Sequence, residues 1–74
     1  SLSLYPNPSQ GLLNLNNPLS ADLKIINLNG ELVWEQNGLN PQSQVNLKSV
    51  AKGLYLAQIR LSDGSFHSEK ILLK

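Results

Sequence analysis

The sequence predicts an all-β protein, a small antiparallel β-sandwich of about seven short strands with an Ig-like arrangement. Apolar and polar residues alternate with a period of two in several segments, and no window keeps the i, i+3, i+4, i+7 spacing of an amphipathic helix. Asparagine, glycine and proline recur at intervals of about 8–12 residues, as turns between short strands require. The chain has 74 residues, enough for one thin core and too few for two, so we expect a single domain over residues 1–74.

The first half of the chain contains four segments that alternate in this way. We expect strands at 1–5, 12–16, 21–28 and 31–36. Asn29-Gly30 lies between the last two of these, and this dipeptide predicts a hairpin with a type I′ turn, in which both central residues have positive φ.

A short proline-containing segment, Tyr5-Pro6-Asn7-Pro8, follows the first expected strand. The two prolines fix two φ angles and remove two backbone donors, so the segment is neither helix nor a fully paired strand. Pro8 also disfavours the helical region for the residue before it. We therefore expect a rigid, extended connection here.

The second half contains three more alternating segments. We expect strands at 43–47, 53–61 and 66–74. Residues 48–53 are the one stretch where we expect a helical turn, ended by Gly53 in the left-handed conformation. Asp63-Gly64 predicts a second tight turn, between the last two strands.

Composition excludes several classes of function. The chain has no cysteine, which rules out disulfides, thiolate metal sites and a cysteine nucleophile. The chain has six lysine and arginine residues and five aspartate and glutamate residues, and they form no runs of like charge. We therefore expect neither nucleic-acid binding nor attraction to an anionic membrane. Apolar runs are too short to span a bilayer, and we expect the targeting signal of an exported protein to lie upstream of these residues.

Candidate catalytic and binding residues are few. His67 and Glu69 share a strand face, but two ligands leave a metal site incomplete, and no serine has an activating sequence context. Glycine spacing gives no phosphate-binding loop. Trp34 either stacks on a sugar or packs half-buried in the sandwich, and we favour packing; Tyr55 alternates as a core residue whose hydroxyl reaches the edge. We therefore expect no enzyme and no cofactor.

Four segments in a fixed order carry a resemblance to a known family: Tyr5-Pro6-Asn7-Pro8 with Gly11, then residues 25–33, 46–59 and 70–74. Together they resemble the type A C-terminal sorting domain of the type IX secretion system (Por secretion system), found on cargo proteins of Bacteroidota. Asn27 stands where aspartate is frequent in that family. The resemblance implies these signal residues: Pro6, Asn7, Pro8, Gly11, Asn27, Gly30, Val33, Gly53, Tyr55, Lys70, Ile71, Leu72, Leu73 and Lys74.

What the resemblance implies is a secretion signal fused to an upstream cargo domain. Such a domain directs its cargo from the periplasm through the outer membrane to the cell surface or beyond, and a sortase-like peptidase usually removes it. Its partners are then the translocon and shuttle proteins, which we expect to dock on the last strands through Tyr55 and residues 70–74. With a thin core, an isolated domain could exchange residues 1–5 between copies. The alternative function is an accessory carbohydrate-binding or fibronectin-like module with Trp34 as its platform.

Overall fold

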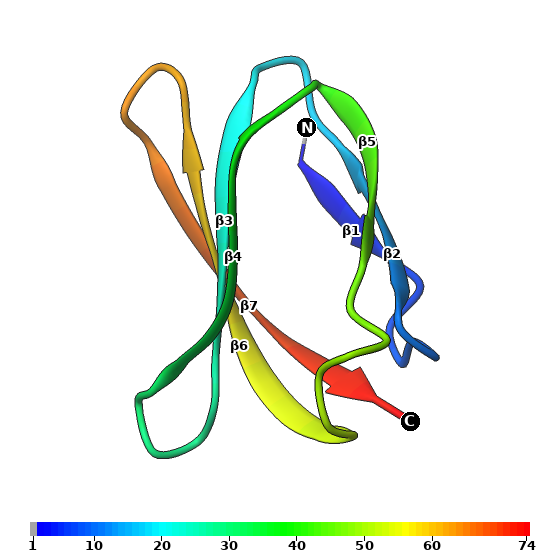
Figure 1. The fold of residues 1–74 in the computed structure, drawn as a ribbon. Helices are drawn as coiled ribbons and strands as arrows, with labels where there is room; N and C mark the ends of the chain where they lie inside the picture. Colours follow the sequence, from blue (N-terminus) through cyan, green and yellow to red (C-terminus); the bar gives the residue numbers. More distant parts are fainter. Residues whose placement is uncertain (1) are drawn as a thin grey trace.

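The computed structural model describes residues 2–74, and this range contains seven strands and no helix. The strands are β1 (Ser3–Tyr5), β2 (Leu12–Asn16), β3 (Ala21–Ile26), β4 (Leu32–Leu39), β5 (Gln42–Asn46), β6 (Gly53–Leu61) and β7 (Phe66–Leu73). They form two antiparallel sheets that face each other, β1-β2-β5 and β4-β3-β6-β7 (Figure 1). The predicted all-β sandwich is confirmed. Ser1, which we expected in the first strand, lies outside the described residues.

The core lies between the two sheets and follows the alternation of the sequence. In β6, for example, Tyr55, Ala57, Ile59 and Leu61 are buried, while the residues between them face outward. Full burial of a large aliphatic side chain contributes about 1.5–3 kcal/mol, so this small set holds the sheets together. The buried hydrophobic residues are Leu4, Leu13, Leu15, Ala21, Leu23, Ile25, Leu39, Val45, Leu47, Tyr55, Ala57, Ile59, Leu61, Ile71 and Leu73.

The hairpin between β3 and β4 differs from the predicted type I′ turn. The Gly30 N–H donates to the Asn27 carbonyl at 3.0 Å, and the Asn27 N–H donates to the Glu31 carbonyl at 2.9 Å. Among the described residues only glycines have positive φ, so Asn29 does not adopt the required conformation, whereas Gly30 has φ +83°. This geometry is a type I turn followed by a left-handed glycine. Asn27 favours it, because its side-chain oxygen accepts hydrogen bonds from the N–H groups of Asn29 and Glu31.

The turn between β6 and β7 repeats this arrangement. The Gly64 N–H donates to the Leu61 carbonyl at 2.9 Å, the Leu61 N–H donates to the Ser65 carbonyl at 2.9 Å, and Gly64 has φ +89°. Asp63 Oδ1 accepts hydrogen bonds from the backbone N–H and the hydroxyl of Ser65. The predicted tight turn at Asp63-Gly64 is therefore confirmed.

The connection from β5 to β6 contains no helical turn, so that prediction is wrong. The Val50 N–H donates to the Leu47 carbonyl at 2.9 Å, which closes one reverse turn, and the chain then crosses from one sheet to the other. Gly53 does not end a helix but begins β6, with φ +150°. The connection must reach from one sheet to the other, and a turn of helix would shorten the distance that its residues can cover.

Candidate recognition surface

The proline-containing segment lies along the outer edge of β7. Asn7 Nδ2 donates to the Lys70 carbonyl at 2.8 Å, and the Leu72 N–H donates to Asn7 Oδ1 at 3.1 Å. A side-chain amide presents the same donor and acceptor as a peptide group, so Asn7 replaces one unit of a neighbouring strand. The peptide bonds before Pro6 and Pro8 are cis, and residues 7 and 8 bend the chain, so the expected extended connection is wrong. The bend brings the chain from β1 in one sheet to β7 in the other.

Ser9 continues the pairing that Asn7 begins. Its N–H donates to the Leu72 carbonyl at 2.8 Å, its carbonyl accepts from the Lys74 N–H at 2.8 Å, and it forms a parallel bridge with Leu73. The Ser9 side chain is buried, and its hydroxyl donates to the Leu12 carbonyl. The outer edge of β7 near residues 70–74 is thus already paired, and a partner strand could be added there only by displacing residues 7–9.

Gly11 follows at a close approach of two chain segments. It has φ +119°, and a Cβ at this position would lie 2.8 Å from Lys48 Cγ and 3.2 Å from Lys48 Cα. The Gly11 carbonyl accepts a hydrogen bond from the Leu47 N–H at 2.6 Å. Glycine is therefore required here both for backbone conformation and for space.

Several of the other signal residues named from the sequence shape the fold. Tyr55, Ile71 and Leu73 are buried in the core, as the alternation predicted for Tyr55. The Tyr55 hydroxyl donates to the Ala51 carbonyl. Asn27 and Gly30 make the β3–β4 turn described above. The buried three, Tyr55, Ile71 and Leu73, therefore affect recognition through the shape of the domain.

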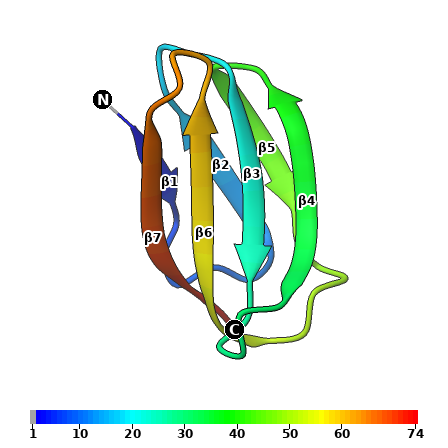
Figure 2. The same ribbon diagram turned by 90° about the vertical axis from the view of Figure 1, so that its left-hand side faces the viewer.

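Four other signal residues, Val33, Lys70, Leu72 and Lys74, are exposed. Val33, Lys70 and Leu72 lie on the outer face of the four-stranded sheet, which faces the viewer in Figure 2. Leu54 lies across from Leu72, and Leu56 lies across from Lys70, so the sheet places these two leucines beside the residues named from the sequence. Sequence reasoning missed Leu54 and Leu56, although their alternation with Tyr55 in the segment 53–61 already places them on the outer face.

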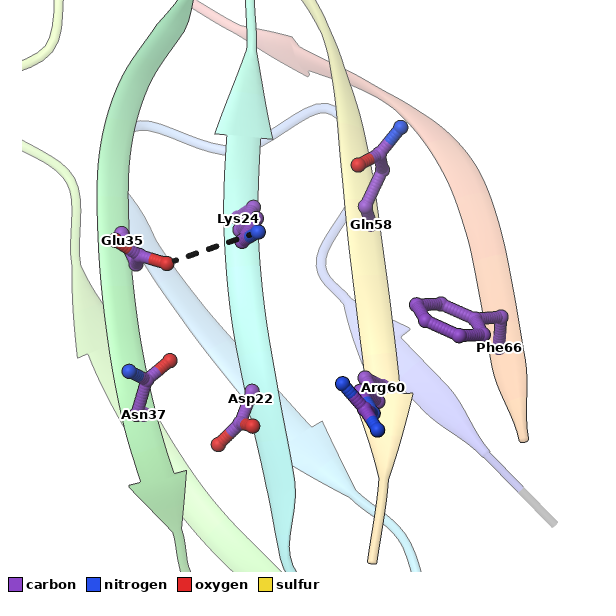
Figure 3. A pocket seen from close by; sticks show the side chains of 7 residues that line it. All are labelled: Asp22, Lys24, Glu35, Asn37, Gln58, Arg60 and Phe66. Carbon is purple, nitrogen blue, oxygen red and sulfur yellow. Dashed lines mark ion pairs between the residues drawn. The ribbon is translucent and has the colours of Figure 1, made fainter. Parts of the chain in front are cut away.

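The other half of this face is polar. Seven residues line a shallow groove there: Asp22, Lys24, Glu35, Asn37, Gln58, Arg60 and Phe66 (Figure 3). The Lys24 ammonium lies 3.9 Å from a Glu35 carboxylate oxygen, and the Arg60 guanidinium lies 5.5 Å from the centre of the Phe66 ring. Both charged side chains of the ion pair are largely exposed, so the pair contributes little to stability.

The candidate metal and sugar sites gain no support. His67 and Glu69 lie on one face of β7 opposite Ile59 and Ala57, and both are exposed. No group of three metal-ligating side chains occurs within residues 2–74. Trp34 is half-buried and packs against the core, as the favoured interpretation predicted. In the described range there is also no helix that could cross a membrane.

The comparisons with known proteins agree with this geometry. A family described as the secretion system C-terminal sorting domain matches residues 3–74, nearly the whole chain. The chain belongs to this family. A search of curated proteins finds no match. The sorting domain is the C-terminal secretion signal of the type IX secretion system, which exports its cargo through the outer membrane to the cell surface or the extracellular space. The family is thus one of signals attached to an upstream cargo, and it acts through the secretion machinery.

Proposed function

We propose that residues 1–74 form a single sorting domain of a larger precursor, read by the translocon and its shuttle proteins as a folded unit and afterwards removed by a sortase-like peptidase. The domain itself has no catalytic role and needs no cofactor. The family match over residues 3–74 is the observation that supports this proposal.

A folded signal must present a stable surface. Contacts between the first and last segments of the domain stabilise the fold that carries this surface. Asn7 and Ser9 pair with β7, so the first and last segments depend on each other. Loss of the last strand would therefore also release the proline-containing segment. This coupling suits a signal that is read only when the whole domain is present and folded.

The test is a fluorescent protein that carries a secretory leader and is fused ahead of residues 1–74, expressed in a host with a working type IX system. We expect fluorescence at the cell surface or in the medium, with the sorting domain missing from the exported product. A host without the translocon should retain the fusion in the periplasm. Equal export in both hosts contradicts the proposed function, and export of the uncleaved fusion contradicts removal by a peptidase.

A further inference from the structure

The outer face of the four-stranded sheet carries an exposed apolar band at one end. The band consists of Ile26, Leu32, Val33, Leu54, Leu56 and Leu72. Ile26 lies across from Leu32 on one side and from Leu56 on the other, and Leu54 lies across from Leu72, so the band crosses all four strands. It occupies the lower end of the sheet in Figure 2, beyond the polar groove of Figure 3.

Four of the six side chains of the band are exposed, and Ile26 and Leu56 are half-buried. The exposed fractions are 51% for Leu32, 40% for Val33, 42% for Leu54 and 37% for Leu72. Single exposed hydrophobic residues are common on protein surfaces, but contiguous patches mark binding sites. The band is contiguous, because its members are direct cross-strand neighbours.

An irregularity in the sheet enlarges the band. The register of β3 and β4 shifts between Ile25 and Ile26, so that Ile25 pairs with Trp34 and Ile26 pairs with Leu32. Val33 is the extra residue of this bulge. Trp34 packs toward the core, while Leu32 and Val33 are both exposed opposite Ile26. A bulge re-aims side chains at the cost of regular pairing, and here it turns two apolar side chains outward instead of one.

We propose that this apolar band is the surface by which a protein of the type IX secretion machinery recognises the sorting domain, and that this protein presents apolar side chains beside carboxylates. The inference rests on the proposed function. Lys70 lies across from Leu56 on the same face, and the one ion pair of the described residues, Lys24–Glu35, leaves the Lys70 ammonium free. A carboxylate placed against Lys70 would steer the encounter and fix its register, while the leucines supply the contact area.

The charge of this face favours a protein over a lipid surface. Recognition of anionic membranes uses clusters of about four to eight basic residues. One lysine, Lys70, lies beside the band, and the full chain has a net charge of +1. Residues 3–5 lie in the other sheet, so a cargo joined ahead of β1 is not attached at the face that carries the band (Figure 1).

The test uses the full reporter fusion and two pairs of matched variants. Leu54→Ser removes an apolar side chain from the band, and Leu12→Ser removes the same side chain, 37% exposed, from the three-stranded sheet. Lys70→Glu reverses the charge beside the band, and Lys48→Glu reverses an exposed charge in the β5–β6 connection. Resistance of the purified fusions to limited proteolysis confirms that each variant is folded. We expect at least tenfold slower export for Leu54→Ser and Lys70→Glu. The controls, Leu12→Ser and Lys48→Glu, should change the rate of export little.

A photocrosslinking amino acid at position 54 or 12 identifies the occupant in cells. The proposal expects an adduct with a translocon or shuttle subunit from position 54 and none from position 12. Equal export of Leu54→Ser and Leu12→Ser, with the unaltered fusion exported, overturns the inference and leaves the proposed function standing; failure of the unaltered fusion to be exported contradicts the proposed function itself. Leu54-dependent binding to vesicles of phosphatidylcholine and phosphatidylglycerol, or Leu54-dependent dimerisation of the fusion, also overturns the inference, because either would assign the band to another occupant.

Discussion

Replacing Asn7 with alanine is expected to loosen the contact between the start and the end of the domain. The substitution removes the hydrogen bonds from Asn7 Nδ2 to the Lys70 carbonyl, at 2.8 Å, and from the Leu72 N–H to Asn7 Oδ1, at 3.1 Å. Each such bond contributes about 0.5–1.5 kcal/mol net. Both are exposed, and water can replace the lost partner, so we expect a loss of about 1–2 kcal/mol in the free energy of unfolding.

That loss is large for a domain of this size. A stability of about 0.05–0.15 kcal/mol per residue gives the whole chain about 4–11 kcal/mol. For a domain of 60–100 residues, each kcal/mol lost lowers Tm by about 4–8 °C. Thermal unfolding followed by circular dichroism resolves a change of this size. Amide hydrogen exchange should show faster exchange at Leu72, whose N–H loses its acceptor.

Two further variants test whether the loss of stability comes from the hydrogen bonds of the Asn7 side chain. Asn16→Ala removes an exposed asparagine from β2 whose side chain makes no hydrogen bond within residues 2–74, and it should leave Tm nearly unchanged. Asn7→Asp keeps the acceptor for Leu72 but sets an oxygen against the Lys70 carbonyl. Its penalty should shrink below pH ~4, where the introduced carboxyl becomes protonated and can donate again. Equal Tm values for Asn7→Ala and Asn16→Ala would refute the reasoning.

Three other substitutions test the remaining local arguments. Gly11→Ala places a Cβ 2.8 Å from Lys48 Cγ at φ +119°, so we expect a loss of about 1–3 kcal/mol in urea unfolding, and an unchanged midpoint would contradict it. Tyr55→Phe removes one part-buried hydrogen bond and should cost about 1 kcal/mol by the same assay, with an unaltered midpoint as the opposing result. The Ser65 hydroxyl and then its N–H hold the pKa of Asp63 below its ordinary value of 3.8. Because this pKa is lower in the folded protein, the stabilisation is present above the pKa of the unfolded chain and is lost as the pH falls through the folded value. In an NMR titration, Ser65→Ala should raise the pKa of Asp63; no change would show that the hydroxyl is not the cause.

The proposed recognition surface could be predicted from the sequence only in part. Lys70, Leu72 and Val33 were named from the family resemblance, and the sheet places all three on one outer face. Leu54 and Leu56 were not named, although a strand with buried Tyr55 and Ala57 must turn them outward. Leu32 joins the band only through the bulge between β3 and β4, because a strict alternation with Trp34, which packs toward the core, would place Leu32 on the inner face.

The conformation of the β3–β4 turn could also be predicted from the sequence only in part. The Asn27–Gly30 segment predicts a turn. The type of this turn depends on whether the side chain of Asn27 or the Asn29-Gly30 dipeptide determines the backbone conformation. The side-chain oxygen of Asn27 accepts two backbone N–H groups, and this decided for a type I turn. When two local sequence preferences favour different turn types, the hydrogen bonds that the flanking strands allow decide which type forms.

In the regular strands the sequence by itself determined which side chains are buried, because an alternation of period two assigns each residue to one face. The bulge at Val33 in β4 is the exception. The sequence also determined where the chain turns. The tertiary structure alone decided that Asn7 bonds to Lys70 and Leu72, which lie 63 and 65 positions away. No local pattern encodes such a pairing, since it exists only once the two sheets have packed and brought the bend after β1 against the edge of β7.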